Sequence, residues 1–302
     1  MVLAPLFLGV PILLGLVWMW GTQGYQQLVS YKVSSDLVTA HEYFAHMHQT
    51  LAVDIAALAG SQRLARAMAA AGEAGIERYL DEARQQAGLD FLYLLDTQGA
   101  LRGAHMPLRH PSARRSDWPV VRQALAGEAA TAIDVFDAEH LAAINPALRQ
   151  RARLSLVPTP NAAPDERLEE TRGLLIHAAI PVRDEGGQLI AVLEGGVLLN
   201  GNSDMVDRIN AIIYREGTLP LGSRGTATLF LGDTRIATNV RLFEGERALG
   251  TRASRAVRDH VLQEGKVWLD TAFVVNDYYV SGYEPVIDSF GKRVGMLYVG
   301  FL

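Results

Sequence analysis

The hydrophobic pattern at the start of the chain predicts a membrane helix that continues into a long stalk. The run Val2–Trp20 contains no charged side chain. About 19 helical residues at about 1.5 Å each give roughly 28 Å, which is enough to cross the hydrocarbon core of a bilayer. Trp18, Trp20 and Tyr25 lie where an aromatic belt would meet the headgroups. We therefore expect residues 1–21 to form a transmembrane helix.

Apolar residues keep a helical spacing well beyond this run. Neighbours in the set are three or four positions apart, which places them on one stripe of a helix. The stripe consists of Val33, Leu37, Ala40, Phe44, Met47, Leu51, Ile55 and Leu58. Its heptad-like part would suit a homodimer seam, and packing on the chain's own sheets is the alternative. This stalk helix and a short helix at 76–87, with a break between them at 70–75, are expected to fill residues 22–87.

From residue 88 onward, short apolar runs alternate with turn residues, which predicts strands and hairpins. The predicted strands are 90–95, 100–104, 131–136, 174–181, 189–199, 226–231, 235–240, 272–286 and 293–302, with helices at 119–125, 204–214 and 254–264. Residues 137–172 fit neither period. The segment 215–225 is rich in glycine and is the best boundary, so we expect an α+β fold with modules at 88–214 and 215–302.

An internal repeat supports two modules of one kind. Six residues recur at a constant offset of 104 positions, and both sets lie on a strand–turn–strand unit. Pro181, Val182, Asp184, Gly187, Leu193 and Gly196 match Pro285, Val286, Asp288, Gly291, Leu297 and Gly300. Tight hairpins often share Pro, Asp and Gly, which is the alternative explanation. Six matches without a gap favour two similar modules in tandem.

The composition fits a globular protein and limits its function. Among 302 residues, 49% are hydrophobic and 20% are charged, and the net charge of −5 argues against a general nucleic-acid binder. Cysteine is absent, which excludes disulfides and thiolate metal sites and says little about the compartment. No Lys or Arg precedes Lys32, so the basic start of a cleaved signal peptide is missing and an uncleaved anchor is favoured. Charge alone therefore does not give the orientation in the membrane.

The sequence offers no recognisable catalytic, metal or cofactor site. His41 and His46 resemble a zinc-protease pair, but they are five residues apart and would point about 140° from each other on a helix. The segment 222–225 lacks the Gly-Lys-Ser/Thr ending of a phosphate loop. Gly195 and Gly196 lie in an apolar run and are better explained by close packing. We predict no catalytic residue, no metal ligand and no cofactor.

Two places have side chains that suit a small ligand. The first lies in the earlier module and centres on a basic loop. Its basic residues are Arg102, His105, Arg109, His110, Arg114 and Arg115. Guanidinium groups offer paired donors that fit carboxylate or phosphate oxygens. Tyr93 and His177, on two predicted strands, complete this candidate set. The alternative is a solvated basic loop without a ligand.

The second place is the run 273–283 of the later module. Strand alternation puts Asp277, Tyr279 and Tyr283 on one face, and we expect Arg252 and Trp268 nearby. A face with a carboxylate and two phenols could line a small polar pocket. The alternative is that the tyrosines pack in the core with their hydroxyls at its rim.

Several runs resemble the fused double Cache sensor module of bacterial transmembrane receptors. They are 214–220, 225–240, 248–252, 273–285 and 295–302, together with 161–165 and 193–200 in the earlier module. The resemblance covers nearly the whole chain and is weakest over 137–172. It implies two PAS-like antiparallel sheets, membrane-distal at 88–214 and membrane-proximal at 215–302, backed by the long periplasmic helix. In this family the last strand leads into a second membrane helix and a cytoplasmic output domain.

The resemblance implies small-ligand sensing and transmembrane signal transduction as the input module of a sensor histidine kinase. Chemoreceptors and diguanylate cyclases carry similar modules, and a membrane-anchored envelope protein-docking module is the alternative from another class. The chain stops at Leu302 and contains no phosphoacceptor histidine box, ATP-binding domain or cyclase signature. Kinase activity is therefore expected only from a C-terminal region absent here.

The resemblance also bears on ligand and location. Ligands of the family are mostly small metabolites, often with a carboxylate or an amine. The amino-acid-binding motif of some double Cache domains is not visible, so no particular ligand is implied. We expect a protein of the bacterial inner membrane, with one anchor in this chain and its main body in the periplasm.

Overall fold

The computed structural model describes residues 4–69, 73–105, 115, 117–215, 217–219, 222–242 and 245–302. For residues 4–27 and Glu73 this covers the backbone alone. The side chains of the predicted membrane segment Val2–Trp20 therefore lie outside the described residues. No helix within the described part of the chain combines the length and the apolar character that a membrane crossing requires.

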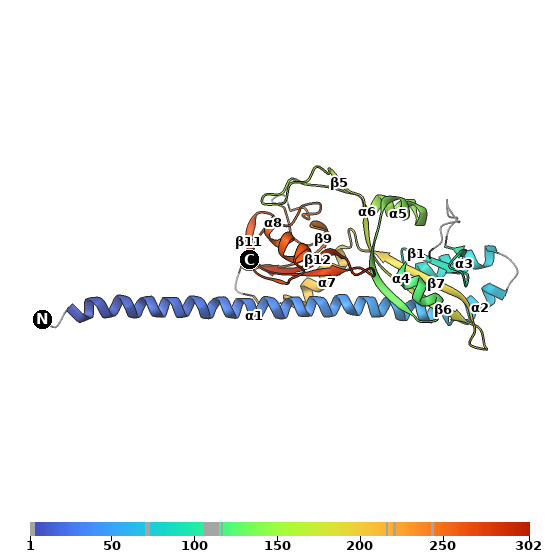
Figure 1. The fold of residues 1–302 in the computed structure, drawn as a ribbon, viewed down its shortest axis with the longest axis horizontal. Coiled ribbons are helices and arrows are strands. Elements are labelled where there is room, and N and C mark those ends of the chain that lie inside the picture. Colours follow the sequence, from blue (N-terminus) through green and yellow to red (C-terminus); the bar gives the residue numbers. More distant parts are fainter. Residues whose placement is uncertain are drawn as a thin grey trace.

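The helix α1 (Ala4–Ala59) runs along two β-sheets, and its N-terminal part extends beyond them (Figure 1). Val33, Leu37 and Ile55 are at most 4% exposed on the side that faces the sheets. Met47 and Leu58 are partly buried on the same side. The predicted apolar stripe is confirmed, and it packs on the chain's own sheets. Its heptad-like part is therefore largely covered within one chain, which leaves little of it for a homodimer seam.

The stalk is interrupted earlier than the sequence suggests. The predicted break lies near residues 70–75, whereas α1 already ends at Ala59. Ser61 then caps α2 (Gln62–Ala69) by accepting a hydrogen bond from a backbone N–H at 3.1 Å. The next helix, α3 (Glu73–Gln86), packs on the edge of the first sheet. The signals for this break are Gly60 and the capping residue Ser61, which directly follow the last residues of the stripe.

The first sheet has the strand order β2-β1-β7-β6-β3, with antiparallel neighbours. Its strands are β1 (Phe91–Leu95), β2 (Leu101–Ala104), β3 (Ala130–Phe136), β6 (Gly173–Arg183) and β7 (Leu189–Leu198). We call the face toward α1 the inner face and the opposite face the outer face. The outer face is covered by α4 (Pro119–Leu125), α5 (Ala138–Ile144) and α6 (Pro146–Ala152).

The second sheet has the strand order β10-β11-β12-β8-β9. Its strands are β8 (Gly225–Leu231), β9 (Thr234–Thr238), β10 (Trp268–Val274), β11 (Asp277–Ile287) and β12 (Arg293–Phe301). Its inner face packs on α1 and on α7 (Ser203–Ile213). Its outer face is covered by α8 (Arg255–Arg258) and the π-helical turn η1 (Asp259–Gln263).

One predicted strand of the second sheet is wrong. The run 272–286 is not continuous, because β10 and β11 form a hairpin around Val275 and Asn276. Val275 has φ of 60°, which is rare for a β-branched residue. Hairpin turns of this kind usually contain a glycine, and this one does not. The alternation of apolar and polar residues alone could therefore not predict the turn.

The two sheets have the same topology. If β1, β2, β3, β6 and β7 are equated with β8, β9, β10, β11 and β12, both sheets have one strand order. Strands β6 and β11 begin at 173 and 277, and β7 and β12 begin at 189 and 293, which is an offset of 104 in both cases. The predicted internal repeat is thus confirmed at the level of topology, and each position of β6 and of β7 up to Val197 has a counterpart in β11 and β12.

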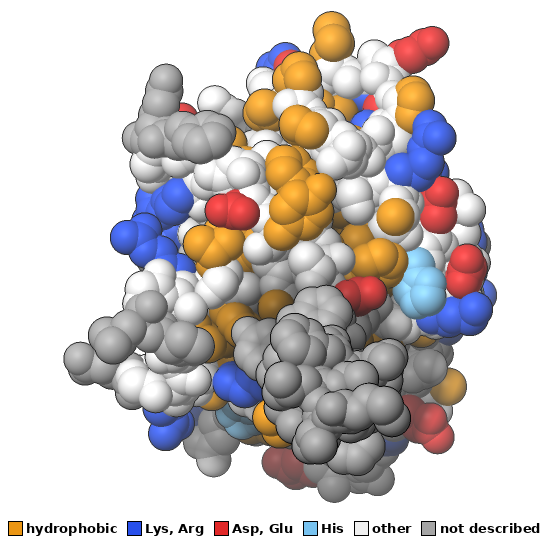
Figure 2. Space-filling view, turned by 90° about the vertical axis from the view of Figure 1, so that its left-hand side faces the viewer, with side chains coloured by type: hydrophobic (Ala, Val, Ile, Leu, Met, Phe, Trp, Pro, Cys, Tyr) orange, Lys and Arg blue, Asp and Glu red, His pale blue; other side chains and the backbone are white. Residues whose placement is uncertain are grey.

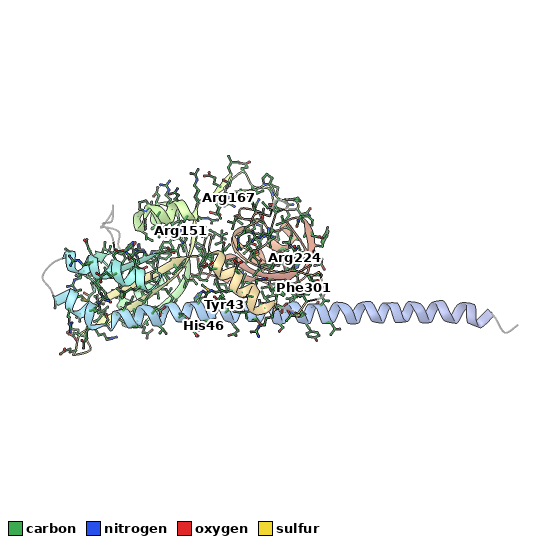
Figure 3. All side chains as sticks on the ribbon, turned by 180° about the vertical axis from the view of Figure 1, so that it is seen from behind. Tyr43, His46, Arg151, Arg167, Arg224 and Phe301 are labelled. Atoms are coloured by element: carbon green, nitrogen blue, oxygen red, sulfur yellow. The ribbon has the colours of Figure 1, made fainter. Side chains whose placement is uncertain are left out.

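The segment 137–172, which fits no simple period, lies between β3 and β6 of the first sheet and reaches across to the second module. It contains α5, α6, β4 (Leu154–Ser155) and β5 (Glu169–Glu170). Between β4 and β5 the chain crosses to the second module, where the Val157 N–H donates to Gly250 O at 3.0 Å. Arg151 and Arg167 lie along this connection, on the side of the sheets away from α1 (Figure 3). Loop-like contacts with another module explain why no local pattern identified it.

The end of the molecule from which α1 extends also carries the end of β12 (Figure 1). The Nζ atom of Lys32 on α1 lies 6.0 Å from the ring centre of Phe301, and Phe301 lies beside α1 (Figure 3). Seen from this end, hydrophobic side chains run through the middle of the face and charged side chains of both signs lie at its sides (Figure 2). The helix and the last strand therefore meet at one end of the second sheet.

Candidate ligand-binding site

A row of buried polar side chains crosses the outer face of the first sheet. Tyr93 of β1, Glu194 of β7, His177 of β6 and Asp134 of β3 are each 0% exposed. Tyr93 lies directly opposite Glu194, and the other two are diagonal neighbours on adjacent strands. Alternation puts all four on one face, because each is separated from core residues of that face by an even number of positions. We call these four residues the polar row.

His177 lies between two carboxylates. Its Nε2 is 2.8 Å from Asp134 Oδ2 and its Nδ1 is 3.2 Å from Glu194 Oε1. Burial alone would lower the pKa of His177, but hydrogen bonds to the two carboxylates outweigh it and raise the pKa. Both ring nitrogens can donate only in the imidazolium form, so this arrangement favours the charged histidine.

Arg115 supplies a second cation above the sheet. Its guanidinium carbon is 4.5 Å from the centre of the Tyr93 ring, and its Nε is 3.6 Å from Glu194 Oε2. Burial would raise the pKa of Glu194, but the charge of Arg115 and the hydrogen bond from His177 hold it below its usual range. Two cations and two carboxylates therefore balance each other at this place.

Two polar atoms of the row make no hydrogen bond to any described residue. The Tyr93 hydroxyl and Glu194 Oε2 are buried and accept or donate no hydrogen bond within the described residues. Buried groups of this kind are normally paired, because an unpaired one costs about 1–3 kcal/mol. A bound amine could donate to Glu194, and a bound carboxylate could accept from Tyr93 and Arg115.

The polar row also touches the second module. The hydroxyl of Ser289, in the turn between β11 and β12, donates to Asp134, whose Oδ1 and Oδ2 are 2.8 and 2.7 Å away. The Ser289 N–H lies 3.1 Å from the same Oδ1. Beside Ser289, the ring centre of Phe290 lies 5.8 Å from that of Trp118. The ring centre of Trp118 lies 5.7 Å from that of His177, in an edge-on arrangement. The cluster of the first sheet thus contacts a hairpin of the second.

The structure distributes the first predicted site set over different places. Tyr93 and His177 share the polar row, whereas Arg102 is exposed. His105 is 7% exposed, its ring centre is 5.9 Å from that of Tyr93, and burial lowers its pKa to about 4. Arg109 lies outside the described residues. Whether these residues bind a ligand stays a prediction.

The second predicted set is also divided. Tyr283 is buried on the outer face of the second sheet, Trp268 lies directly opposite it, and Tyr279 is partly buried on the same face. Asp277 is exposed at the start of β11. Arg252 is engaged elsewhere, since it donates to Asp233 at 2.7 Å and to Ala163 O at 2.6 Å, and so it holds the segment between β4 and β5 against the second module.

The sequence missed the residues that organise the polar row. Glu194 is a single charge inside the apolar run 189–198, and Asp134 is a single charge inside β3. A charge in the middle of a strand with both faces covered is the signal that could have found them. Although a histidine and two carboxylates meet here, no group of three such side chains among the described residues is arranged to hold a metal ion.

Comparison with known proteins adds two family matches. Residues 29–214 match the family described as "Double sensory domain of two-component sensor kinase". Residues 197–302 match the family described as "Single cache domain 3". A search of curated proteins found no match to the sequence.

The comparison with solved structures finds sensor domains of other bacterial proteins. The periplasmic domain of Vibrio cholerae LuxQ has 12% identity and a TM-score of 0.48, with 89% of this chain and 99% of that chain covered. The sensor domain of the V. cholerae histidine kinase DctB has 12% identity and a TM-score of 0.40, with 93% and 97% covered. The sensory domain of the Campylobacter jejuni chemoreceptor Tlp3, with isoleucine bound, has 11% identity and a TM-score of 0.42, with 93% of both chains covered.

Proposed function

Because this chain belongs to the family of double sensory domains of two-component sensor kinases, we propose that it is the input module of a sensor histidine kinase. Cache domains sense small ligands outside the cytoplasm, so the body of the chain is periplasmic in this proposal. The run Val2–Trp20 anchors it in the bacterial inner membrane. Residues 88–214 form the membrane-distal module and residues 215–302 the membrane-proximal one.

The polar row is the observation that carries this proposal. It holds a balanced set of charges, and two of its polar atoms, the Tyr93 hydroxyl and Glu194 Oε2, make no hydrogen bond to any described residue. Arg115 approaches Glu194 Oε2 only to ion-pair distance, 3.6 Å. A small ligand with an amine and a carboxylate would complete the hydrogen bonding there and compete with the existing pairs. Competition for Glu194 would change the partner of His177, and His177 shares Asp134 with Ser289. Ligand binding would thereby alter the contact between the modules.

A change at that contact has a mechanical route to the membrane. Both sheets pack on α1, and both α1 and β12 lead to the same end of the molecule (Figure 1). A ligand that binds one packing of the sheets more tightly than another shifts the balance by its difference in affinity alone. A shift of the second sheet along α1 would then displace the ends of α1 and β12 relative to each other.

Other output classes and another function class remain alternatives. A chemoreceptor or a diguanylate cyclase would use the same sensing step with a different cytoplasmic domain. The coding sequence beyond Leu302 separates these outputs: a second apolar span, a phosphoacceptor histidine and an ATP-binding domain support the kinase. An envelope protein-docking module would need no small ligand at the polar row.

The binding test uses the full chain in detergent micelles. Each of the common amino acids, and simple carboxylates and amines, is added separately while thermal unfolding is followed by intrinsic fluorescence. At about 100 times Kd, a ligand should stabilise the fold by about 2.7 kcal/mol, which corresponds to a rise of roughly 5 °C in Tm. The variants Glu194→Gln and Arg115→Met should lose this rise.

Arg122→Met is the matched control, because Arg122 is an exposed arginine on α4. It should respond to the ligand as the unmodified chain does. A ligand that stabilises Glu194→Gln and Arg115→Met as strongly as the unmodified chain would contradict the site. A panel without any stabilising compound would contradict small-ligand sensing and favour the docking module.

A further inference from the structure

Arg235 is a buried cation that forms no ion pair with a carboxylate of the described residues. It lies on β9, its side chain faces the outer core of the second sheet, and it is 1% exposed. Its Nη1 donates to Thr251 Oγ1 at 2.9 Å and to Arg252 O at 3.4 Å, and its Nε has no hydrogen-bond partner within the described part of the chain. Among the described residues no carboxylate forms an ion pair with it. The neighbouring Asp233 is already taken by Arg252.

Aromatic rings surround the guanidinium. Its carbon is 4.9 Å from the centre of the Phe230 ring, and the Phe230 and Tyr283 rings are 6.0 Å apart. Tyr283 and Tyr298 face each other across β11 and β12, with their ring centres 4.6 Å apart. Burial raises the pKa of Tyr283 to about 12, so this phenol is neutral and does not balance the charge of Arg235.

The internal repeat makes the imbalance clear. At the offset of 104 positions, Tyr298 stands where the first sheet has Glu194, and Ser281 stands where it has His177. Each pair lies on the same face of its sheet. In the first sheet, two carboxylates balance two cations. In the second sheet, neutral hydroxyl groups replace the charged pair, and Arg235 remains as an unbalanced positive charge.

An anion would correct this arrangement. A buried ion is costly unless it is paired and its donors are satisfied. A carboxylate accepts two parallel hydrogen bonds from a guanidinium and accepts further ones from phenols. One cation calls for one negative charge, and the rings of Phe230 and Tyr283 suit a short apolar or aromatic tail.

We propose that the outer face of the second sheet binds a small monocarboxylate at Arg235, with Tyr283 and Tyr298 beside the carboxylate. This site is separate from the polar row, so its test does not depend on whether the polar row binds a ligand. The partly buried Trp268 and Tyr279 lie on the same face, on the edge strand β10 and on its neighbour β11.

The test compares carboxylates with their neutral amides. The full chain in detergent micelles is heated with acetate, propionate or benzoate, and in parallel with acetamide, propionamide or benzamide. At least one acid should raise Tm by roughly 5 °C at about 100 times Kd, and its amide should not. Arg235→Met should abolish the rise. It should also leave the unliganded Tm unchanged or higher, because it removes an unpaired buried charge.

Controls keep the test decisive. Arg241→Met removes an exposed arginine of the same module and should keep the response. Tyr283→Phe keeps the ring, so it should fold even if Arg235→Met does not, and it should weaken binding by roughly fivefold through the loss of one hydrogen bond.

Three results would overturn the proposal. In the first, no acid stabilises the unmodified chain more than its amide. In the second, Arg235→Met and Tyr283→Phe respond fully. In the third, Arg115→Met loses the response and Arg235→Met keeps it, which would move carboxylate binding to the polar row and so support the proposed function while contradicting this site.

Discussion

The contact between Ser289 and Asp134 should have a measurable share in the stability of the whole chain. Ser289 lies in the hairpin turn of the second sheet, and Asp134 is a fully buried residue of the first. The hydroxyl of Ser289 reaches both oxygens of the carboxylate, at 2.8 and 2.7 Å. Ser289→Ala removes this hydroxyl and leaves the backbone N–H in place at 3.1 Å. The change is therefore confined to one donor.

The expected loss follows from the chemistry of that donor. A hydroxyl has one hydrogen, so only one hydrogen bond to the carboxylate counts although two oxygens are in reach. A hydrogen bond to a charged group contributes about 1.5–3 kcal/mol, and the remaining N–H limits the damage. We expect Ser289→Ala to lower the free energy of unfolding by about 1–2 kcal/mol. At about 2–4 °C for each kcal/mol, Tm should fall by roughly 2–8 °C.

The assay is a double-mutant cycle followed by thermal unfolding of the full chain. Ser289→Ala, Asp134→Asn and the double variant should give a coupling energy of about 1 kcal/mol. Glu185→Ala is the matched control, because Glu185 is exposed at the equivalent position of the β6–β7 hairpin. A coupling energy near zero, or an equal loss in Glu185→Ala, would refute the inference that the hairpin holds the two modules together at Asp134.

Two further predictions concern pH and the stalk. Burial lowers the pKa of His105 to about 4 and the carboxylates raise that of His177, so Tm measured from pH 4 to 9 should peak near pH 6.5. The contribution of His105 is lost as pH falls from about 6.5 to about 4, whereas that of His177 is lost as pH rises through its folded pKa. His177→Gln should therefore flatten the alkaline side, and an unchanged profile would contradict this assignment. Ile55→Ala should lower the free energy of unfolding by about 2–5 kcal/mol in denaturant titrations, and exposed Val53→Ala by less than about 0.5 kcal/mol; equal losses would show that the stripe is not the packed side.

Periodicity predicted most of the framework, because each element has one face buried against another. The stripe with Val33, Leu37 and Ile55 identified both the long helix and the side on which the sheets pack. Strands were found wherever glycine or aspartate marks the turn. The turn at Val275 was missed because a β-branched residue takes the left-handed conformation there. The boundary between modules at 214 and 215 stays a prediction.

The candidate site was only partly predictable. Tyr93 and His177 were found as residue types that suit a ligand, and they lie in one row. Glu194, Asp134 and Arg235 were not selected, since a charge within a strand carries no motif and its partners come from distant segments. Whether such a charge is part of a binding site depends on whether an opposite charge lies beside it. That neighbour is known only once the strand pairing is known.

Each module contributes a segment that packs on the other, and this limits how the modules can be transferred to another protein. The β11–β12 turn of the second sheet contacts Asp134 of the first sheet. The segment between β4 and β5 of the first module contacts Arg252 and Gly250 of the second. A chimaera that receives only one of the two modules would lack the residues that make both of these contacts from the other module. In receptor engineering, and in the evolutionary shuffling of sensory domains, the two modules should therefore be transferred together.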